Sequence, residues 1–176
     1  MKNFTMKNLL QGSFFSLVFT GLALSAAAQE TLPEVSVVSF NYRYMRSVHD
    51  AAAAQPVRML ERMAATYDLR KADFYDQEFD NYFVTFYIPA GEVLAFYDKN
   101  GKILHTAEKF KNIALPSSVS QAVAKRYPGW SIAKDVYLVN YYADSDKDPR
   151  KMYKLVLENG DKRIRVKTND SGSFLE

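Results

Sequence analysis

The sequence contains no cysteine among its 176 residues and only two histidines. A chain without thiols has no disulfide, no thiol nucleophile and no cysteine-bound zinc or iron–sulfur cluster. The histidines, His49 and His105, lack the partner four residues away that marks a helical zinc site. A folded domain of this chain must therefore be held together by its core alone.

Motifs of the common hydrolases and nucleotide-binding proteins are missing as well. The sequence has no phosphate-binding glycine loop, no Gly-x-Ser-x-Gly turn and no His-x-Gly-His motif. Its 23 basic residues are nearly balanced by 20 acidic ones, which is atypical of a nucleic-acid-binding protein. We therefore predict a protein that is not an enzyme, holds no cofactor or metal, and does not bind nucleic acid.

One acidic loop has part of the spacing of a calcium site. Asp144, Asp146 and Asp148 match positions 1, 3 and 5 of such a loop, but Pro149 replaces its glycine and Leu155 its final glutamate. We interpret the segment as a solvated acidic loop, with a weak surface calcium site as the alternative.

Long apolar runs are also absent. The longest, residues 14–24, is far shorter than the ~20 residues that span a bilayer. Lys2 and Lys7 precede it, and a stretch of small residues ending at Ala28 follows it. This order predicts a signal peptide over residues 1–28, cleaved near Ala28. We expect a periplasmic or secreted protein without a membrane span after cleavage; an uncleaved anchor is the alternative.

Residues 29–55 precede the regular part of the chain. Within them, residues 34–45 are rich in valine and aromatic residues that mostly alternate with polar ones, which favours a strand. We predict an N-terminal strand or arm that either forms a sheet edge or pairs with a partner.

Residues 115–176 have the pattern of a helix, a long strand, a hairpin and a closing strand. The hairpin prediction rests on apolar–polar alternation on both sides of Asn159-Gly160. Residues 56–108 have the same order of features, and their hairpin matches the later one at a constant shift of 71 positions, as Tyr82 matches Tyr153. We predict a tandem repeat; the alternative is chance agreement, because all hairpins share the same local features.

The helices of the two repeats match at a shift of 60, so the second repeat holds 11 additional residues, which we place in the polar loop 142–150. Residues 107–114 are interpreted as a linker. Met59 and Met63 are expected to be core residues of the first helix. The predicted class is α+β: a tandem repeat of one helix packed on a four-stranded antiparallel sheet, with the two sheets continuous.

Alternation assigns the strand side chains to two faces, because neighbouring residues point to opposite sides. If Tyr82 and Phe86 face the helix, the opposite face of the sheet is open, with an aromatic half in the first repeat and a basic half in the second. Exposed aromatics and arginine are typical of binding surfaces. The candidate partner-binding residues are Phe83, Tyr87, Leu94, Phe96, Tyr137, Tyr141, Arg163, Arg165 and Lys167. Two alternatives stay open: the N-terminal segment covers the aromatic half, or the basic half is simply solvated.

Several of these features together resemble a known family. Leu115-Pro116, Tyr127-Pro128-Gly129, the Asn159-Gly160 turn and the later turn with Gly172 resemble the beta-lactamase-inhibitor-like, PepSY-like family of exported bacterial proteins. The resemblance is clearest over residues 115–172 and does not extend to residues 29–55. It implies two units of one helix on four strands, a concave sheet that contacts an enzyme, and a link to peptidase control. The missing disulfides and the 11 additional residues depart from the inhibitor.

We therefore expect an exported, non-catalytic binding module that engages an unknown protein or peptide through its open sheet face. The alternative is an inhibitor or regulator of an exported peptidase or beta-lactamase.

Overall fold

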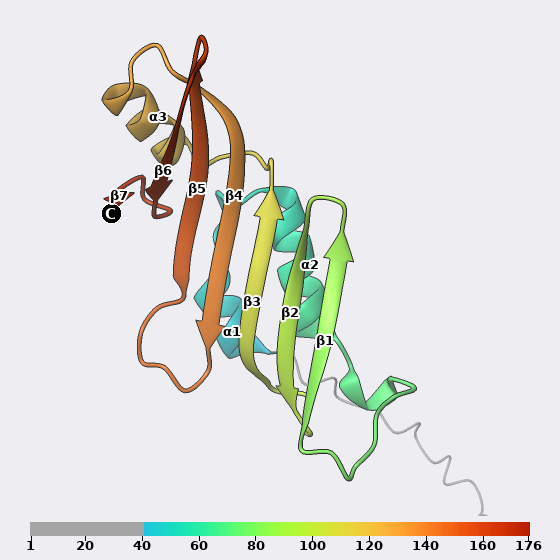
Figure 1. The fold of residues 1–176 in the computed structure, drawn as a ribbon. Helices are drawn as coiled ribbons and strands as arrows, with labels where there is room; N and C mark the ends of the chain where they lie inside the picture. Colours follow the sequence, from blue (N-terminus) through green and yellow to red (C-terminus); the bar gives the residue numbers. More distant parts are fainter. Residues whose placement is uncertain (1–40) are drawn as a thin grey trace, which may run out of the picture. The chain divides into compact units, whose positions relative to one another are not determined.

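A computed structural model of the chain describes residues 41–176, which form one antiparallel sheet of seven strands with helices packed against it (Figure 1). The strands follow one another across the sheet in chain order. They are β1 Asn81–Ile88, β2 Gly91–Asp98, β3 Ile103–Lys111, β4 Ser131–Tyr142, β5 Arg150–Asn159, β6 Lys162–Thr168 and β7 Phe174–Leu175. The α+β class and the continuous sheet are confirmed.

The helices are α1 Tyr42–Val48, α2 Gln55–Thr66 and α3 Ser117–Arg126, with a short 3-10 helix, η1, at Leu69–Lys71. Helices α1 and α2 lie behind β1 to β4 in Figure 1, so one face of this half of the sheet is covered and the other is open. Within residues 41–176, none of the helices has both the length and the apolarity needed to cross a bilayer.

Helix α2 forms because its apolar residues recur at the spacing of a helical turn. Pro56 fits the first turn, where no backbone donor is needed. Val57, Leu60 and Ala64 are fully buried against the sheet, as expected. The prediction for Met59 and Met63 is wrong, since their side chains are 42% and 46% exposed on the solvent side of the helix.

The strand predicted over residues 34–45 is wrong where the structure describes it, because residues 42–45 belong to α1. Tyr44 and Val48, one helical turn apart, are both 1% exposed, so burying this pair outweighs the strand preference of the aromatic residues. The Asn41 side chain fixes the start of α1 by bonding the backbone of the β2–β3 turn and of Ile103. Residues 1–40, with the predicted signal peptide and most of the predicted arm, lie outside the described residues.

The tandem four-stranded repeat is not confirmed, although the two hairpins correspond in register. Tyr82 faces Tyr97 in the first, and Tyr153 faces Thr168 in the second, each 71 positions later. The halves differ in what precedes the hairpin. The first has η1 and turns, whereas the second has the whole strand β4. The 11 additional residues therefore belong to a strand as well as to the loop after it.

The predicted linker 107–114 is also partly wrong, because β3 continues to Lys111. Its last residues pair with β2 on one side and β4 on the other. This pairing brings Phe110 very close to Gly91 and requires glycine there. A Cβ atom built on Gly91 would lie 2.6 Å from the Lys109 carbonyl oxygen and would collide with the Phe110 ring. The second hairpin turns at Gly160-Asp161, one residue later than predicted, and Gly160 has a φ of 58°.

Candidate functional site

The open face of the sheet begins with a row of four aromatic rings, one from each of the first four strands. Phe83, Phe96, His105 and Tyr142 are successive cross-strand neighbours on β1, β2, β3 and β4. The Phe83 and Phe96 rings stack with centroids 4.7 Å apart, and those of His105 and Tyr142 with centroids 4.3 Å apart. Phe83 is 71% exposed and Tyr142 52% exposed. The row therefore presents a broad apolar surface to solvent.

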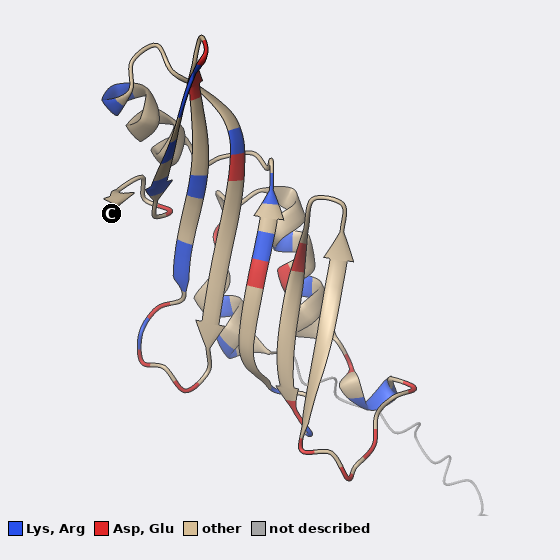
Figure 2. Cartoon of the chain, viewed as in Figure 1, with Lys and Arg blue, Asp and Glu red and all other residues tan. Residues whose placement is uncertain are grey.

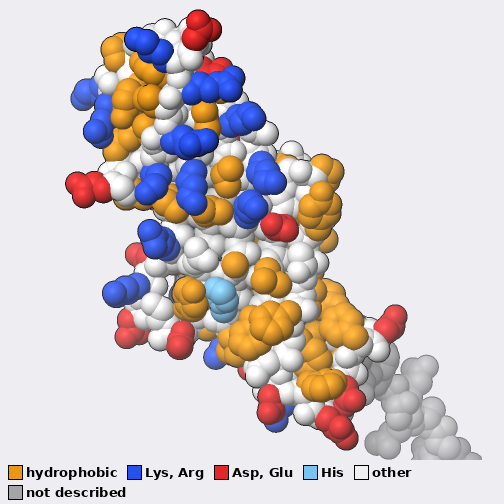
Figure 3. All heavy atoms as spheres, in the orientation of Figure 1, with side chains coloured by type: hydrophobic (Ala, Val, Ile, Leu, Met, Phe, Trp, Pro, Cys, Tyr) orange, Lys and Arg blue, Asp and Glu red, His pale blue; other side chains and the backbone are white. Residues whose placement is uncertain are grey.

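Tyr87 and Leu94 extend this surface along β1 and β2, and Tyr87 is 71% exposed. Figure 3 shows hydrophobic side chains gathered over the first strands, with a histidine beside them. We call the six side chains the aromatic patch: Phe83, Tyr87, Leu94, Phe96, His105 and Tyr142.

A hollow of about 400 Å³ lies at the end of the aromatic row. It is lined by Phe96, His105 and Tyr142, together with Leu104 and the start of the loop after β4. The Nε2 atom of His105 is buried here and has no hydrogen-bond partner within residues 41–176. Burial lowers the pKa of His105, so the ring stays neutral at physiological pH. A neutral ring with a free polar atom can accept or donate one hydrogen bond to a bound group.

The other half of the open face is basic. Figure 2 places lysines and arginines along β4, β5 and β6, and Figure 3 shows the corresponding blue patch. Of the described residues on these three strands, Glu158 supplies the one carboxylate on the open face, and it forms an ion pair with Arg163. We give the name basic patch to five of the other exposed cations of this face: Lys111, Lys134, Lys154, Arg165 and Lys167.

Two lysines of the basic patch face each other directly. Lys154 on β5 and Lys167 on β6 are cross-strand partners, and both side chains are exposed. Like charges in this position destabilise a sheet. The Lys167 amine hydrogen-bonds the carbonyl oxygen of Glu176 at 3.0 Å, and the Lys154 amine has no such contact among the described residues. An acidic group from a partner would relieve the repulsion.

Seven of the nine predicted site residues lie on the open face, divided between its aromatic and basic halves. The prediction is wrong for Tyr137 and Tyr141, which are 1% and 3% exposed and point toward the helices. The ring of Tyr137 stacks on that of Tyr153 in the core, with centroids 4.4 Å apart. Sequence reasoning missed Tyr142, the neighbour that faces solvent, and it missed the place of His105 in the aromatic row.

A pair of buried carboxyl groups lies on the opposite, helix-covered face. Glu61 of α2 and Glu108 of β3 are 1% and 3% exposed. The Tyr44 hydroxyl donates a hydrogen bond of 2.9 Å to Glu108 Oε1, and the Thr106 hydroxyl donates one of 2.8 Å to the same atom. The Oε2 atoms of both carboxyl groups have no partner among the described residues.

The pKa values of this pair are both raised. Burial, and then the charge of Glu108, raise the pKa of Glu61 to about 9. Burial also raises the pKa of Glu108 to about 7, against the opposing hydrogen bonds from Thr106 and Tyr44. Glu61 therefore carries a proton at neutral pH, because a charged carboxylate would be poorly solvated there.

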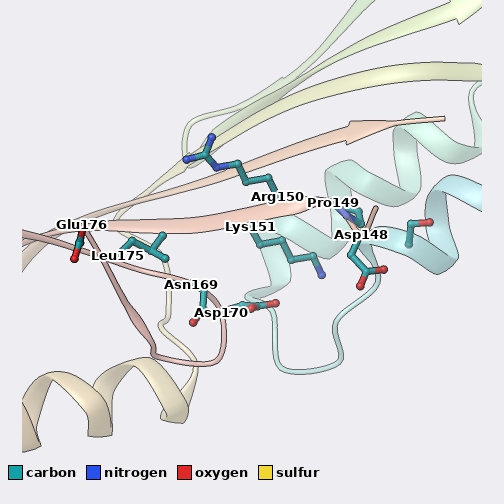
Figure 4. A pocket seen from close by; sticks show the side chains of 9 residues that line it. Asp148, Pro149, Arg150, Lys151, Asn169, Asp170, Leu175 and Glu176 are labelled. Carbon is teal, nitrogen blue, oxygen red and sulfur yellow. The ribbon is translucent and has the colours of Figure 1, made fainter. Parts of the chain in front are cut away.

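The helix side also has a hollow of about 710 Å³ between α1 and the C-terminal turn (Figure 4). Lys151 points into it from β5, while Arg150 points to the other side of the sheet. The Lys151 amine donates a 2.8 Å hydrogen bond to the carbonyl oxygen of Val48, so its charge is used to hold α1. Within residues 41–176 no group of three or more histidine or acidic side chains is arranged to hold a metal ion, the loop with Asp144 included.

No family model matches the chain. No curated protein matches it either. Similar solved structures include a DUF2874 family protein from Bacteroides uniformis ATCC 8492, at 10% identity and a TM-score of 0.34, covering 55% of this chain and 69% of that chain. A DUF2874 family protein from Bacteroides ovatus ATCC 8483 is 12% identical with a TM-score of 0.34, and the match covers 60% of this chain and 75% of that chain.

A BLIP-like protein from Bacteroides fragilis NCTC 9343 is 19% identical with a TM-score of 0.31, covering 57% of this chain and 69% of that chain. None of the three names mentions PepSY. At these scores the matches assign neither a family nor a partner.

Proposed function

We propose that this protein is a non-catalytic binding module that engages an acidic and partly apolar protein or peptide through the open face of its sheet. The observation that carries the proposal is the division of one continuous face into an aromatic patch and a basic patch. Both patches cost free energy in the isolated protein, and the same partner would recover both costs.

The aromatic patch supplies affinity. Phe83 and Tyr87 are each 71% exposed, and water-exposed aromatic surface costs about 25 cal/mol per Å². Aromatic side chains held on a rigid sheet also lose little entropy on binding, because β1 and β2 already fix their backbones. Apolar side chains of a partner would pack against this row, and the hollow beside His105 would receive one of them.

The basic patch supplies selectivity and orientation. Lys154 and Lys167 repel each other across β5 and β6, so a carboxylate placed between them gains from two cations at once. A partner that is acidic at one end and apolar at the other is therefore expected to bind in a single direction.

The experiment starts by identifying the partner with photo-crosslinkers placed at Tyr87 and Lys154, followed by titration of the purified partner. We expect alanine at Phe83, Tyr87 and Phe96 together to weaken binding at least about thirtyfold, the effect of losing one strong aromatic anchor. Glutamate at Lys154 and Lys167 should slow association and weaken its salt dependence.

The matched control is the Phe74→Ala, Phe79→Ala double variant. These rings are 55% and 59% exposed, but they contact Tyr82, which faces the helices. Loss of binding in this control, or full binding by the triple variant, would contradict the proposal. If the partner is an exported peptidase or beta-lactamase, its turnover in the presence of the bound protein distinguishes an inhibitor from a neutral ligand.

A further inference from the structure

The two edges of the sheet are protected very differently. At one edge, β7 is only two residues long and the neighbouring β6 carries Lys162, Arg163, Arg165 and Lys167. Short, charged edges of this kind discourage pairing with another sheet. At the other edge, β1 has eight residues, and residues 82–88 include no charge, no proline and no bulge. In Figure 1, η1 lies near the start of β1 only.

The outer backbone groups of β1 are free within the described chain. The two-residue turn at Pro89-Ala90 makes Ile88 and Gly91 a hydrogen-bonded pair. By alternation, the amide and carbonyl groups of Phe83, Thr85 and Tyr87 point away from β2. Within residues 41–176, no backbone hydrogen bond outside the β1–β2 ladder reaches them.

The side chains of β1 are complementary to a second copy of the same strand. If two copies run antiparallel about a two-fold axis at Thr85, Phe83 of each copy faces Tyr87 of the other. Facing aromatic residues are favourable cross-strand pairs. Asp80, the nearest charged residue before β1, would face the uncharged Ala90 of the other copy. The register therefore places no like charges opposite each other and pairs the two most exposed aromatic residues of the strand.

We propose that the protein forms a two-fold dimer through β1, in which two copies of the strand pair antiparallel about Thr85 and the two seven-stranded sheets become continuous. The pairing forms about six backbone hydrogen bonds, two for each facing pair of outward residues. It brings the two aromatic patches side by side on one open face. The dimer forms through the backbone edge of the sheet, so the result of its test does not depend on whether the proposed function is correct.

Sedimentation of the protein as the cell produces it, measured over a range of concentrations, tests the dimer. We expect a monomer–dimer equilibrium whose dissociation constant rises roughly tenfold or more in Thr85→Lys and in Thr85→Glu, because each places like charges at the axis. An equimolar mixture of the two variants should recover the dimer, which a misfolded variant could not do.

The matched control is Leu94→Lys. Leu94 is the cross-strand partner of Thr85 on β2, so the variant adds the same charge to the same face one strand further in. It should dimerise like the natural chain. Hydrogen exchange gives a second readout, with the Thr85 amide protected only at concentrations where the dimer forms. A monomer at every concentration, a Thr85 amide protected in the monomer, or a dimer insensitive to both Thr85 variants would overturn the proposal.

Discussion

Replacing Glu61 by glutamine should make the protein more stable, and more so as the pH rises. The carboxyl group of Glu61 is buried beside that of Glu108, and its pKa is raised to about 9 from an ordinary value of 4.5. A carboxyl group whose pKa is higher in the folded state contributes stability that is fully present below pH 4.5 and is lost as the pH rises toward 9. The unfolded chain ionises in that window and the folded protein does not.

The magnitude follows from the number of protons retained. When the folded protein holds one proton that the unfolded chain does not, the free energy of unfolding falls by about 1.4 kcal/mol for each unit by which the pH rises. Between pH 6 and pH 8 the natural protein should therefore lose about 2.7 kcal/mol through Glu61, and the Glu61→Gln variant should not. Glu108, whose pKa is raised to about 7, adds to the loss below pH 7 in both proteins.

Urea denaturation at several pH values between 5 and 9 measures this difference. The control is Glu92→Gln, which removes a carboxyl group from the open face of β2 and leaves the buried pair intact. If the natural protein and the Glu61→Gln variant lose stability with parallel pH profiles, the buried, protonated state inferred for Glu61 is wrong.

Three further predictions concern the sheet itself. Lys154→Gln should raise the free energy of unfolding by about 0.2–1 kcal/mol at low ionic strength by removing repulsion from Lys167, and salt titration of the stability should show the gain disappearing as screening increases. Gly91→Ala should lower the melting temperature by several degrees, consistent with a loss of about 1–3 kcal/mol, because the new methyl group collides with Phe110; an unchanged melting curve would refute this close contact. Gly172→Ala, at a φ of +85° against the first turn of α3, should lower the urea midpoint without changing the slope of the transition.

The parts of the fold that could be predicted from the sequence are those with a complete local signal. The hairpin β5–β6 has alternation on both strands and a glycine at the turn, so its existence and its open face, with Arg165 and Lys167, follow from the residues. Its register does not, because the turn lies at Gly160-Asp161 rather than at Asn159-Gly160. Helix α2 likewise shows its buried stripe directly.

Other elements have patterns that conceal their orientation. Residues 136–139 of β4 are all apolar or aromatic, so the sequence does not show which set of alternate residues faces the helices. Whether Tyr141 or Tyr142 is buried depends on the pairing with β3. In β3 the pattern is inverted, since the polar Thr106 and Glu108 face the core and Ala107 faces outward. Because of this inversion, residues 107–111 were predicted to be part of a linker rather than of the strand.

The order of the strands has a kinetic consequence. Every strand pairs with its neighbour in the chain, and all connections except the one through α3 are short. Assembly of the sheet therefore closes mostly short loops, which are fast to form. Helix α1 is the exception, since the bond between Lys151 and the Val48 carbonyl joins groups 103 positions apart. We expect α1 to dock first on the β2–β3 turn and β3, through Asn41 and Tyr44, and its C-terminal end to be fixed only once β5 is in place.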